Sequence, residues 1–368
     1  MSFSDLFGMD PQIRSLQRAL KNDNLAGCYV FVGPAGVGKT ALAMAVAKAA
    51  ACLNRNGGED SCGDCSSCHV FDSGTHPEIN LISPAGDTTQ IWQFWDRPSK
   101  PNGILQHSLS YAPTVGAKRV YIIERADTLT ESAANSILKS LEEPPPFAMF
   151  ILLTPHTTRL LPTILSRSQI IRIPNSPTDD LSEFLTTKFG FSHEIAATSA
   201  AYSEGRTGAA IRMARNPEIS AELEKLVDAT IGLSSSSRLG SLRAAEQFRK
   251  TASSLKALLD IDAPAKDAEV PEAGGEASPK ERVSKKSLAI ALEVAAVICR
   301  DLLSLSLSGA DAKIIHGGQK LALLATAQLR PPQEWFGATG AVLTARKRIE
   351  QNVPGGLATD WLALEISR

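Results

Sequence analysis

Eight consecutive residues near the start of the chain have the types and the spacing that bind phosphate. They are Gly33-Pro34-Ala35-Gly36-Val37-Gly38-Lys39-Thr40, which fit the pattern G-x-x-x-x-G-K-[ST]. The glycines let backbone N–H groups curl around phosphate oxygens, and the dipole of a following helix adds to the attraction. Lys39 would reach the β- and γ-phosphates, and the Thr40 hydroxyl would hold Mg²⁺. The sequence therefore predicts a site for ATP or ADP with Mg²⁺. The alternatives are a plain glycine turn and a loop that has kept its shape but lost its ligand.

A P-loop enzyme that hydrolyses its nucleotide also needs an acid on a neighbouring strand and a residue that activates water. In this chain Glu124 and Arg125 follow an apolar run at 120–123. Glu124 can hold the metal, with its extra methylene moving the carboxylate outward. Arg125 cannot accept a proton, because a guanidinium stays protonated at neutral pH. We therefore expect nucleotide binding without hydrolysis by this chain. In the alternative, Arg125 makes a surface ion pair and Asp127 takes over the metal.

Four of the six cysteines lie close together, as Cys52, Cys62, Cys65 and Cys68. The two overlapping C-x-x-C turns bring three thiolates together within seven residues, and Cys52 would complete a tetrahedral zinc site. Four protein ligands leave no position open for water, so we expect structural Zn²⁺. His69 is adjacent and is an alternative ligand, and redox disulfides are the alternative chemistry. Cys28 and Cys299 stand in apolar runs that are typical of a core.

Arg167 follows a short segment, 161–166, in which Pro162 favours the first turn of a helix. This arrangement would place Ser166 and Arg167 near the exposed end of that helix. The residues alone favour a salt-bridged surface arginine, since exposed arginines are common.

The elements that must position these residues are strands alternating with helices over the first 175 residues. Apolar runs at 28–32, 120–123, 150–153 and 170–173 are typical of buried strands, and the alanine-rich segment 40–51 is typical of a helix. Apolar residues at helical spacing between the second and third runs predict another helix, with Thr130 as its cap and Pro144 as its stop. Such alternation predicts a parallel sheet with right-handed crossovers.

Beyond Pro174 the pattern becomes helical. Two or three short helices are expected at about 177–215, and a helical bundle from about 218 to the end. Residues 262–286 are rich in Ala, Pro, Glu, Gly and Lys, and they predict a disordered loop within that bundle.

Composition excludes several classes of protein. The chain has 368 residues, is 43% hydrophobic, and carries 38 Lys+Arg against 39 Asp+Glu. This balance is a poor electrostatic match for DNA, so partners would have to supply the attraction. No apolar run reaches the length of a membrane helix, so we expect no membrane partner. The start of the chain has neither a basic stretch nor an apolar one, so we expect no secretion signal.

Taken in order, these motifs resemble the delta-prime subunits of bacterial DNA polymerase III clamp loaders, a family of AAA+ proteins. The resemblance rests on the phosphate loop, the cysteine quartet, His76-Pro77-Glu78, the segment from Ala133 to Pro145 with its Leu-Glu-Glu-Pro-Pro end, and the segment from Leu161 to Arg167.

The resemblance implies an α/β fold in three domains. These are an AAA+ P-loop domain over 1–175 with a parallel sheet and an inserted zinc module at 52–68, a small helical lid over 176–216, and an all-α collar over 217–368 that oligomerises. It also implies that Arg167 is catalytic in trans, as a finger in the ATP site of a neighbouring subunit. The family has a cysteine where this chain has Ser168. Gly208 takes the place of a nucleotide-sensing arginine, with Arg206 and Arg212 close by.

The first hypothesis for function is therefore a largely non-hydrolysing stator of the clamp loader. The resemblance implies that its partners are gamma/tau motor subunits, a delta subunit, the sliding clamp, and primed DNA held by the assembled complex. It further implies a bacterial, cytoplasmic protein at the replisome. The second hypothesis is an active, gamma/tau-like clamp-loader ATPase. The third is a zinc-containing nucleic-acid-binding protein unrelated to replication.

Overall fold

A computed structural model describes residues 2–55, 58–86, 88–100, 103–234, 238–259, 285–312, 314–351 and 353–367. The chain forms two compact units, the first comprising Met1–Phe184 and Ser203–Ala209, and the second Leu185–Tyr202 and Ala210–Arg368. The loop expected at 262–286 lies outside the described residues, except for its last two residues, which begin the helix α12 (Lys285–Ser308).

The first unit is built on a five-stranded sheet, in which all the pairings are parallel and the strand order is β2-β3-β4-β1-β5. The strands are β1 (Cys28–Val32), β2 (Ile79–Ile82), β3 (Arg119–Ile123), β4 (Ala148–Thr154) and β5 (Gln169–Arg172). The three central strands, β1, β3 and β4, are buried at every position. Such largely apolar, buried runs are typical of a parallel sheet covered on both faces. Four of the five strands confirm the expected positions, and β2 is an addition.

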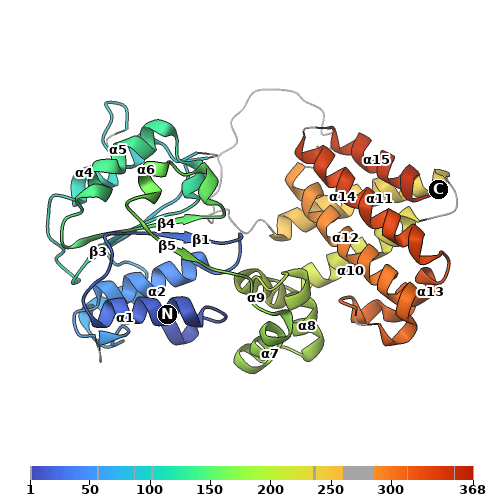
Figure 1. Cartoon of the computed structure of the whole chain (residues 1–368), viewed down its shortest axis with the longest axis horizontal. Coiled ribbons are helices and arrows are strands. Elements are labelled where there is room, and N and C mark those ends of the chain that lie inside the picture. Colours follow the sequence, from blue (N-terminus) through green and yellow to red (C-terminus); the bar gives the residue numbers. More distant parts are fainter. Residues whose placement is uncertain are drawn as a thin grey trace. The chain divides into compact units, whose positions relative to one another are not determined.

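Helices cover both faces of this sheet (Figure 1). On one face lie α1 (Asp10–Lys21) and α2 (Lys39–Ala51), whose core includes Phe31 of β1. On the other lie α4 (Ile104–Ser108), α5 (Glu131–Glu142) and α6 (Pro162–Leu165), whose core includes Val30 of the same strand. Neighbouring residues of a strand point to opposite faces, so each central strand contributes to both cores. The α/β fold class with a parallel sheet is confirmed.

The helix α5 begins and ends where local chemistry requires. The Thr130 hydroxyl accepts a hydrogen bond from the N–H of Ala133, 3.3 Å away, and so caps the first turn. Three prolines begin at Pro144, two residues after the last residue of α5. They stop the helix because proline lacks the N–H that a helix needs. The short helix expected at Pro162 is also present as α6.

Three short helices follow the sheet, namely α7 (Thr178–Phe189), α8 (His193–Tyr202) and α9 (Thr207–Arg215). Their number and positions agree with the two or three helices that the sequence predicts. The boundary at 216 between a lid and a collar stays a prediction.

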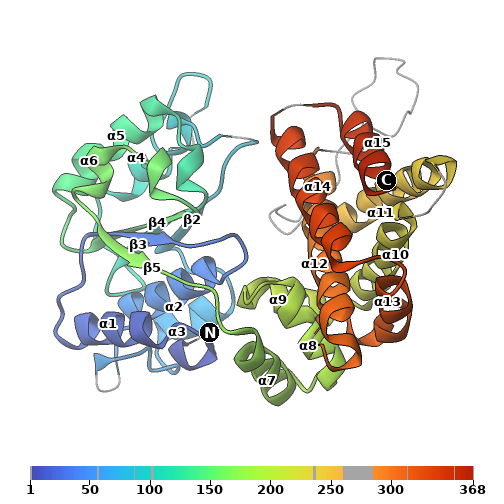
Figure 2. The same ribbon diagram turned by 45° about the vertical axis from the view of Figure 1, so that its right-hand side comes forward.

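The rest of the second unit is helical (Figure 2). Its largest fully buried side chains include Trp335 and Phe248, which share one core with residues from each helix from α10 (Pro217–Leu233) to α15 (Gly355–Ile366). The helices between these two are α11 (Arg238–Leu259), α12, α13 (Lys320–Ala327) and α14 (Pro332–Glu350). Among the residues described, no helix has the length and apolarity needed to cross a membrane.

Candidate functional site

The predicted phosphate loop connects the end of β1 to the start of α2. Gly36 and Gly38 adopt left-handed backbone angles, with φ of 80° and 110°, which glycine reaches without a steric penalty. At Gly33 an added Cβ would lie 2.4 Å from the carbonyl oxygen of Ile173. All three glycines of the motif are therefore required by the geometry of this turn.

Lys39 lies over the first residues of the loop. Its Nζ donates to the carbonyl oxygens of Gly33 and Pro34, at 2.7 and 2.8 Å. These acceptors are neutral, and a phosphate oxygen would form the stronger, charge-assisted bond with the same ammonium. Lys39 is thus placed to exchange loop carbonyls for phosphate.

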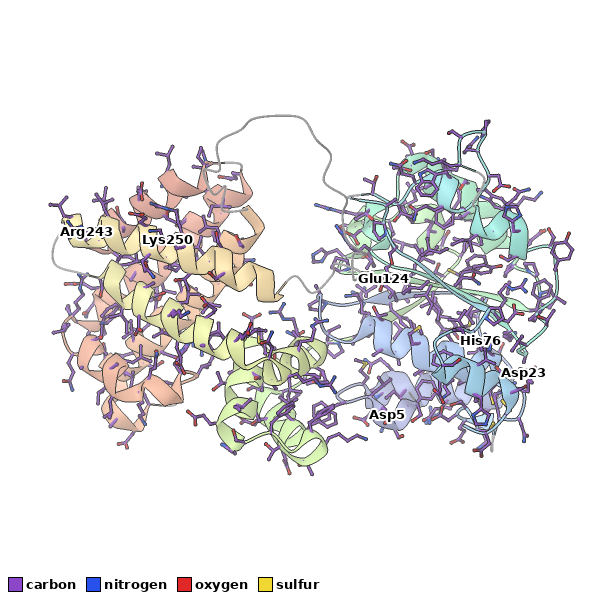
Figure 3. The ribbon with its side chains drawn as sticks, turned by 180° about the vertical axis from the view of Figure 1, so that it is seen from behind. Asp5, Asp23, His76, Glu124, Arg243 and Lys250 are labelled. Atoms are coloured by element: carbon purple, nitrogen blue, oxygen red, sulfur yellow. The ribbon has the colours of Figure 1, made fainter. Side chains whose placement is uncertain are left out.

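Thr40 and Glu124 are brought together across the carboxyl edge of the sheet, where Figure 3 shows Glu124 at the end of the strands. The Thr40 hydroxyl lies 3.3 Å from Glu124 Oε1, and the Ser83 hydroxyl donates to Oε2 at 2.7 Å. A hydroxyl and a carboxylate so close together are the oxygen ligands that Mg²⁺ accepts from proteins. Ser83 directly follows β2, and sequence analysis missed it together with that strand.

Among the described residues, the Arg125 side chain makes no hydrogen bond or ion pair with this cluster. Arg125 has a left-handed backbone, with φ of 45°, its side chain is exposed, and it makes no ion pair with any described residue. The surface ion pair of the alternative interpretation is therefore not formed within the described chain. Asp127 lies one turn further on, and its Oδ1 is 3.5 Å from the hydroxyl of Thr154 at the end of β4. Thr154 is a polar residue that ends a buried apolar strand, a signal that could have identified it.

The start of α9 packs directly on the phosphate loop. The N–H of Ala209 donates to the carbonyl oxygen of Gly36 at 3.0 Å, and a Cβ on Gly208 would lie 2.9 Å from that oxygen. No side chain fits at position 208 unless the loop moves. The nearby Arg206 uses its Nε to bond the carbonyl of Ser203 at 2.8 Å, so that nitrogen is bonded to the preceding turn.

Arg167 follows α6 at the surface, as the sequence predicts. Its Nη2 lies 2.7 Å from Glu142 Oε1, and its Nη1 donates to the Thr163 carbonyl at 3.0 Å. The arginine and glutamate side chains are 36% and 45% exposed, so their ion pair contributes about 0–1 kcal/mol. Within this chain Arg167 is the salt-bridged surface residue that its sequence context favours.

The four predicted cysteine ligands form one cluster, with all four sulfur atoms within 4.8 Å of one another. Cys52 Sγ lies 3.5 Å from Cys62 Sγ and 3.8 Å from Cys65 Sγ. Zinc–sulfur bonds of about 2.3 Å place tetrahedral ligands about 3.8 Å apart, so the quartet fits a zinc ion. The cysteines are not disulfide-bonded, and the exposed His69 is outside the cluster. The donor set and spacing favour a closed structural metal centre.

Backbone donors favour the thiolate of Cys65, whereas burial raises the pKa of Cys52 and Cys68. Burial acts to raise the pKa of Cys65, but hydrogen bonds from the N–H groups of Cys68 and Leu53 and from neighbouring thiols outweigh it and lower that pKa to about 6. The N–H of Cys62 points at Cys52 Sγ, and the N–H of Cys65 at Cys62 Sγ, each at 3.3 Å. Backbone donors of this kind stabilise the charged form that a metal binds.

The end of α2 anchors this module. Cys52 directly follows α2, and α3 (Ser66–Asp72) carries Cys68. Lys48 of α2 is buried and pairs with Asp72 of α3 at 2.6 Å. The Ser67 hydroxyl donates to the Ala51 carbonyl at 2.9 Å, which ties the first turn of α3 to the last residue of α2.

The motif His76-Pro77-Glu78 is part of a buried network. His76 Nε2 lies 2.9 Å from the Ser67 hydroxyl, while its Nδ1 accepts from the N–H of Glu78 at 3.1 Å. Burial lowers the pKa of His76 and favours the neutral ring. Glu78 is 1% exposed and pairs through Oε2 with Arg119 Nε at 2.5 Å. The motif therefore joins the metal module to the start of the sheet, a role that sequence analysis missed.

Comparisons with known proteins find matches to the first half of the chain. Residues 8–177 match the family described as DNA polymerase III, delta subunit. The chain is 35% identical over 172 residues to DNA polymerase III subunit delta′ of Bacillus subtilis, covering 46% of this chain and 49% of that one. It is 34% identical over 142 residues to the delta′ subunit of Pseudomonas aeruginosa, covering 39% and 41%.

The chain is also 32% identical over 166 residues to subunit tau/gamma of Haemophilus influenzae, covering 45% of this chain and 23% of that one. Each match spans about half or less of the relative's length. Among solved structures, a gamma subunit-related protein of DNA polymerase III from Thermotoga maritima aligns with 86% of this chain and 98% of its own, at 17% identity and a TM-score of 0.43. Residues 8–177, which hold both the phosphate loop and the cysteine cluster, are thus similar to the delta′ and tau/gamma subunits of DNA polymerase III.

Proposed function

We propose that this protein is a clamp-loader subunit of DNA polymerase III that acts as a non-hydrolysing stator in the loading of the sliding clamp on primed DNA. The observation that carries the proposal is Arg125. An exposed guanidinium directly follows Glu124, where hydrolysis needs a group that accepts a proton. Gly208 supports it, because its contact with Gly36 leaves no room for a nucleotide-sensing side chain.

The proposed catalytic contribution is Arg167, offered to the ATP site of a neighbouring gamma/tau-type subunit. Its present partner, Glu142, holds it through a half-exposed ion pair that stabilises the fold little. A γ-phosphate carrying several negative oxygens would compete well for the same guanidinium. A finger supplied in trans stabilises the charge that develops during phosphoryl transfer.

Exposed apolar side chains on the C-terminal helices support assembly with gamma/tau and delta subunits. Phe336 and Leu343 lie seven residues apart on α14 and are 73% and 51% exposed. Leu357 and Leu364 have the same spacing on α15 and are 65% and 39% exposed. Residues seven apart lie on one face of a helix, so each pair forms an apolar stripe of the kind that subunit interfaces cover.

We also propose that the assembled protein acts at the replisome in the bacterial cytoplasm.

Replacing Arg167 with alanine tests the finger. In a complex reconstituted with gamma/tau and delta subunits, clamp and primed DNA, we expect Arg167→Ala to slow ATP turnover at least about tenfold. Assembly, measured by gel filtration with light scattering, should not change. The matched control is Arg159→Ala, which removes another exposed arginine from the same connection between β4 and β5. If ATP turnover falls equally in both variants, or does not fall in either, Arg167 is not the arginine finger.

The second candidate function, a gamma/tau-like ATPase, is favoured by the contact between Thr40 and Glu124, which brings together two oxygen ligands for Mg²⁺ beside the phosphate loop. Steady-state ATP turnover by the isolated chain separates the two functions. We expect none above background, together with ATP or ADP binding that Lys39→Ala weakens by about tenfold or more. Turnover by the isolated chain that Lys39→Ala abolishes would overturn the stator proposal.

A further inference from the structure

The second unit contains a cavity of about 250 Å³ between α8, α10 and the turn that precedes α13. Its volume is below the usual range of pockets for drug-sized ligands, so it suits something as small as one side chain. The cavity is lined by Glu194, Ile195, Thr198, Tyr202, Leu223, Glu224, Val227, His316 and Gln319.

His316, which lines this cavity, is paired with the buried carboxylate of Asp301. Asp301 is fully buried and accepts hydrogen bonds from the backbone N–H groups of Ile315 and His316, at 2.9 and 3.1 Å. The same carboxylate oxygen lies 2.6 Å from His316 Nδ1. Asp301 Oδ2 also accepts from two backbone N–H groups, so His316 Nδ1 is the donor in this contact, and in the Nδ1–H tautomer that the contact selects Nε2 is an acceptor.

The Nε2 acceptor has no partner among the described residues. His316 is 5% exposed, and its Nε2 is buried without a hydrogen bond. The ring of Tyr202 packs edge-on against the imidazole at 4.8 Å, which holds the ring in place. Buried polar atoms are almost always paired, so an unpaired acceptor beside a cavity indicates a donor that comes from outside.

A second residue that lines the cavity also has a buried polar atom without a hydrogen bond. Gln319 Oε1 is also buried without a partner among the described atoms. The two carboxylates of the lining, Glu194 and Glu224, belong to exposed residues, and none of the described lysines and arginines lines the cavity. Burial first, and then the charges of Asp301 and Glu224, raise the pKa of Tyr202. The polar side of the cavity therefore offers acceptors and negative charge.

We infer that this cavity binds the cationic end of an aliphatic amine or guanidinium. Such a group brings several N–H donors for His316 Nε2 and Gln319 Oε1, and Glu194 and Glu224 balance its charge. Its methylenes would pack on the aliphatic wall formed by Ile195, Leu223 and Val227. Two sources supply this chemistry, namely a free cation of the polyamine type and an arginine or lysine side chain of another protein.

Titration of the full chain with agmatine, followed by calorimetry, tests the inference. We expect saturable binding that the double variant Glu194→Gln/Glu224→Gln weakens by about tenfold or more, through loss of two charge-assisted contacts. Both glutamates are exposed, so the variant should keep the fold. Asp228→Asn is the matched control, because Asp228 is an exposed acid one turn further along α10 that does not line the cavity. It should bind agmatine as the parent does.

A second measurement reports on the buried acceptor itself. In chain labelled with ¹⁵N-histidine, agmatine should shift the Nε2 resonance that the His316→Gln chain lacks. Titration with capped arginine amide distinguishes the two sources of the cation. If this amide binds as tightly as agmatine, the source is a protein side chain. If only agmatine binds, the source is a free cation. Absence of saturable binding, equal binding by the double glutamine variant, or equal binding of capped glutamate amide would overturn the inference.

Discussion

Replacing Cys65 with serine is expected to remove zinc from the chain and to unfold the module between α2 and α3. The four sulfur atoms lie within 4.8 Å of one another, and a serine hydroxyl is a poor substitute for a thiolate ligand. A structural zinc site contributes about 10–16 kcal/mol of apparent binding energy in small zinc domains, so its loss should be the largest single effect in this protein. Elemental analysis should find one zinc per parent chain and none in the variant.

The matched control is Cys299→Ala, which removes a cysteine outside the cluster. Cys299 is fully buried in the second unit, where burial raises the pKa of its thiol to about 12 and keeps it protonated. This variant should retain the metal even if the helical unit melts at a lower temperature. A parent protein that is folded and free of metal, or a Cys65→Ser protein with its full zinc content, would contradict the metal centre.

Truncating Glu78 to alanine is expected to cost about 3–5 kcal/mol of unfolding free energy. Glu78 is 1% exposed, and its removal would leave the buried Arg119 guanidinium without its counter-charge. The same carboxylate accepts from the N–H of Thr114 at 2.7 Å, so a loop would lose its anchor as well. Urea denaturation followed by circular dichroism measures the change.

Glu59→Ala supplies the control for that measurement. Glu59 pairs with Lys21 at 2.7 Å, but both side chains are at least half exposed, so its loss should cost about 0–1 kcal/mol. Equal costs at Glu59 and Glu78 would show that burial does not govern the Glu78 pair.

The pair of Glu78 with Arg119 also predicts how the stability of the fold depends on pH. Burial acts to raise the pKa of Glu78, but the bond with Arg119 and the N–H of Thr114 outweigh it and lower that pKa below the ordinary 4.5. A lowered folded-state pKa means that the contribution is complete above the unfolded value and is lost as pH falls through the folded one. As the pH falls from about 4.5 to the folded-state pKa of Glu78, the free energy of unfolding of the parent protein should therefore decrease more than that of Glu78→Ala.

Much of the fold could be predicted from local patterns. The strands β1, β3 and β4 are continuous apolar runs because both of their faces are covered, and such runs are visible in a sequence. The strand β2 was missed because it is an edge strand of four residues, Ile79–Ile82, in which only Ile82 is fully buried. Short, half-exposed edge strands carry little periodicity.

The candidate site was predictable where its residues are close in sequence. The loop from Gly33 to Thr40 and the cysteine quartet are local motifs with a fixed spacing. The contact of Ser83 with Glu124 depends on β2 lying beside β3, and the pairing of Asp301 with His316 depends on a turn that folds back on α12. Such partners come from separate elements, so no spacing in the chain indicates them.

The close approach of Gly208 to Gly36 has a consequence for how this chain can change over evolutionary time. Because a Cβ there would lie 2.9 Å from a loop carbonyl oxygen, every single substitution at 208 forces the phosphate loop to shift. An arginine at this position would first need compensating changes elsewhere, in the loop or at the start of α9. The phosphate loop and the start of α9 are therefore constrained to change together.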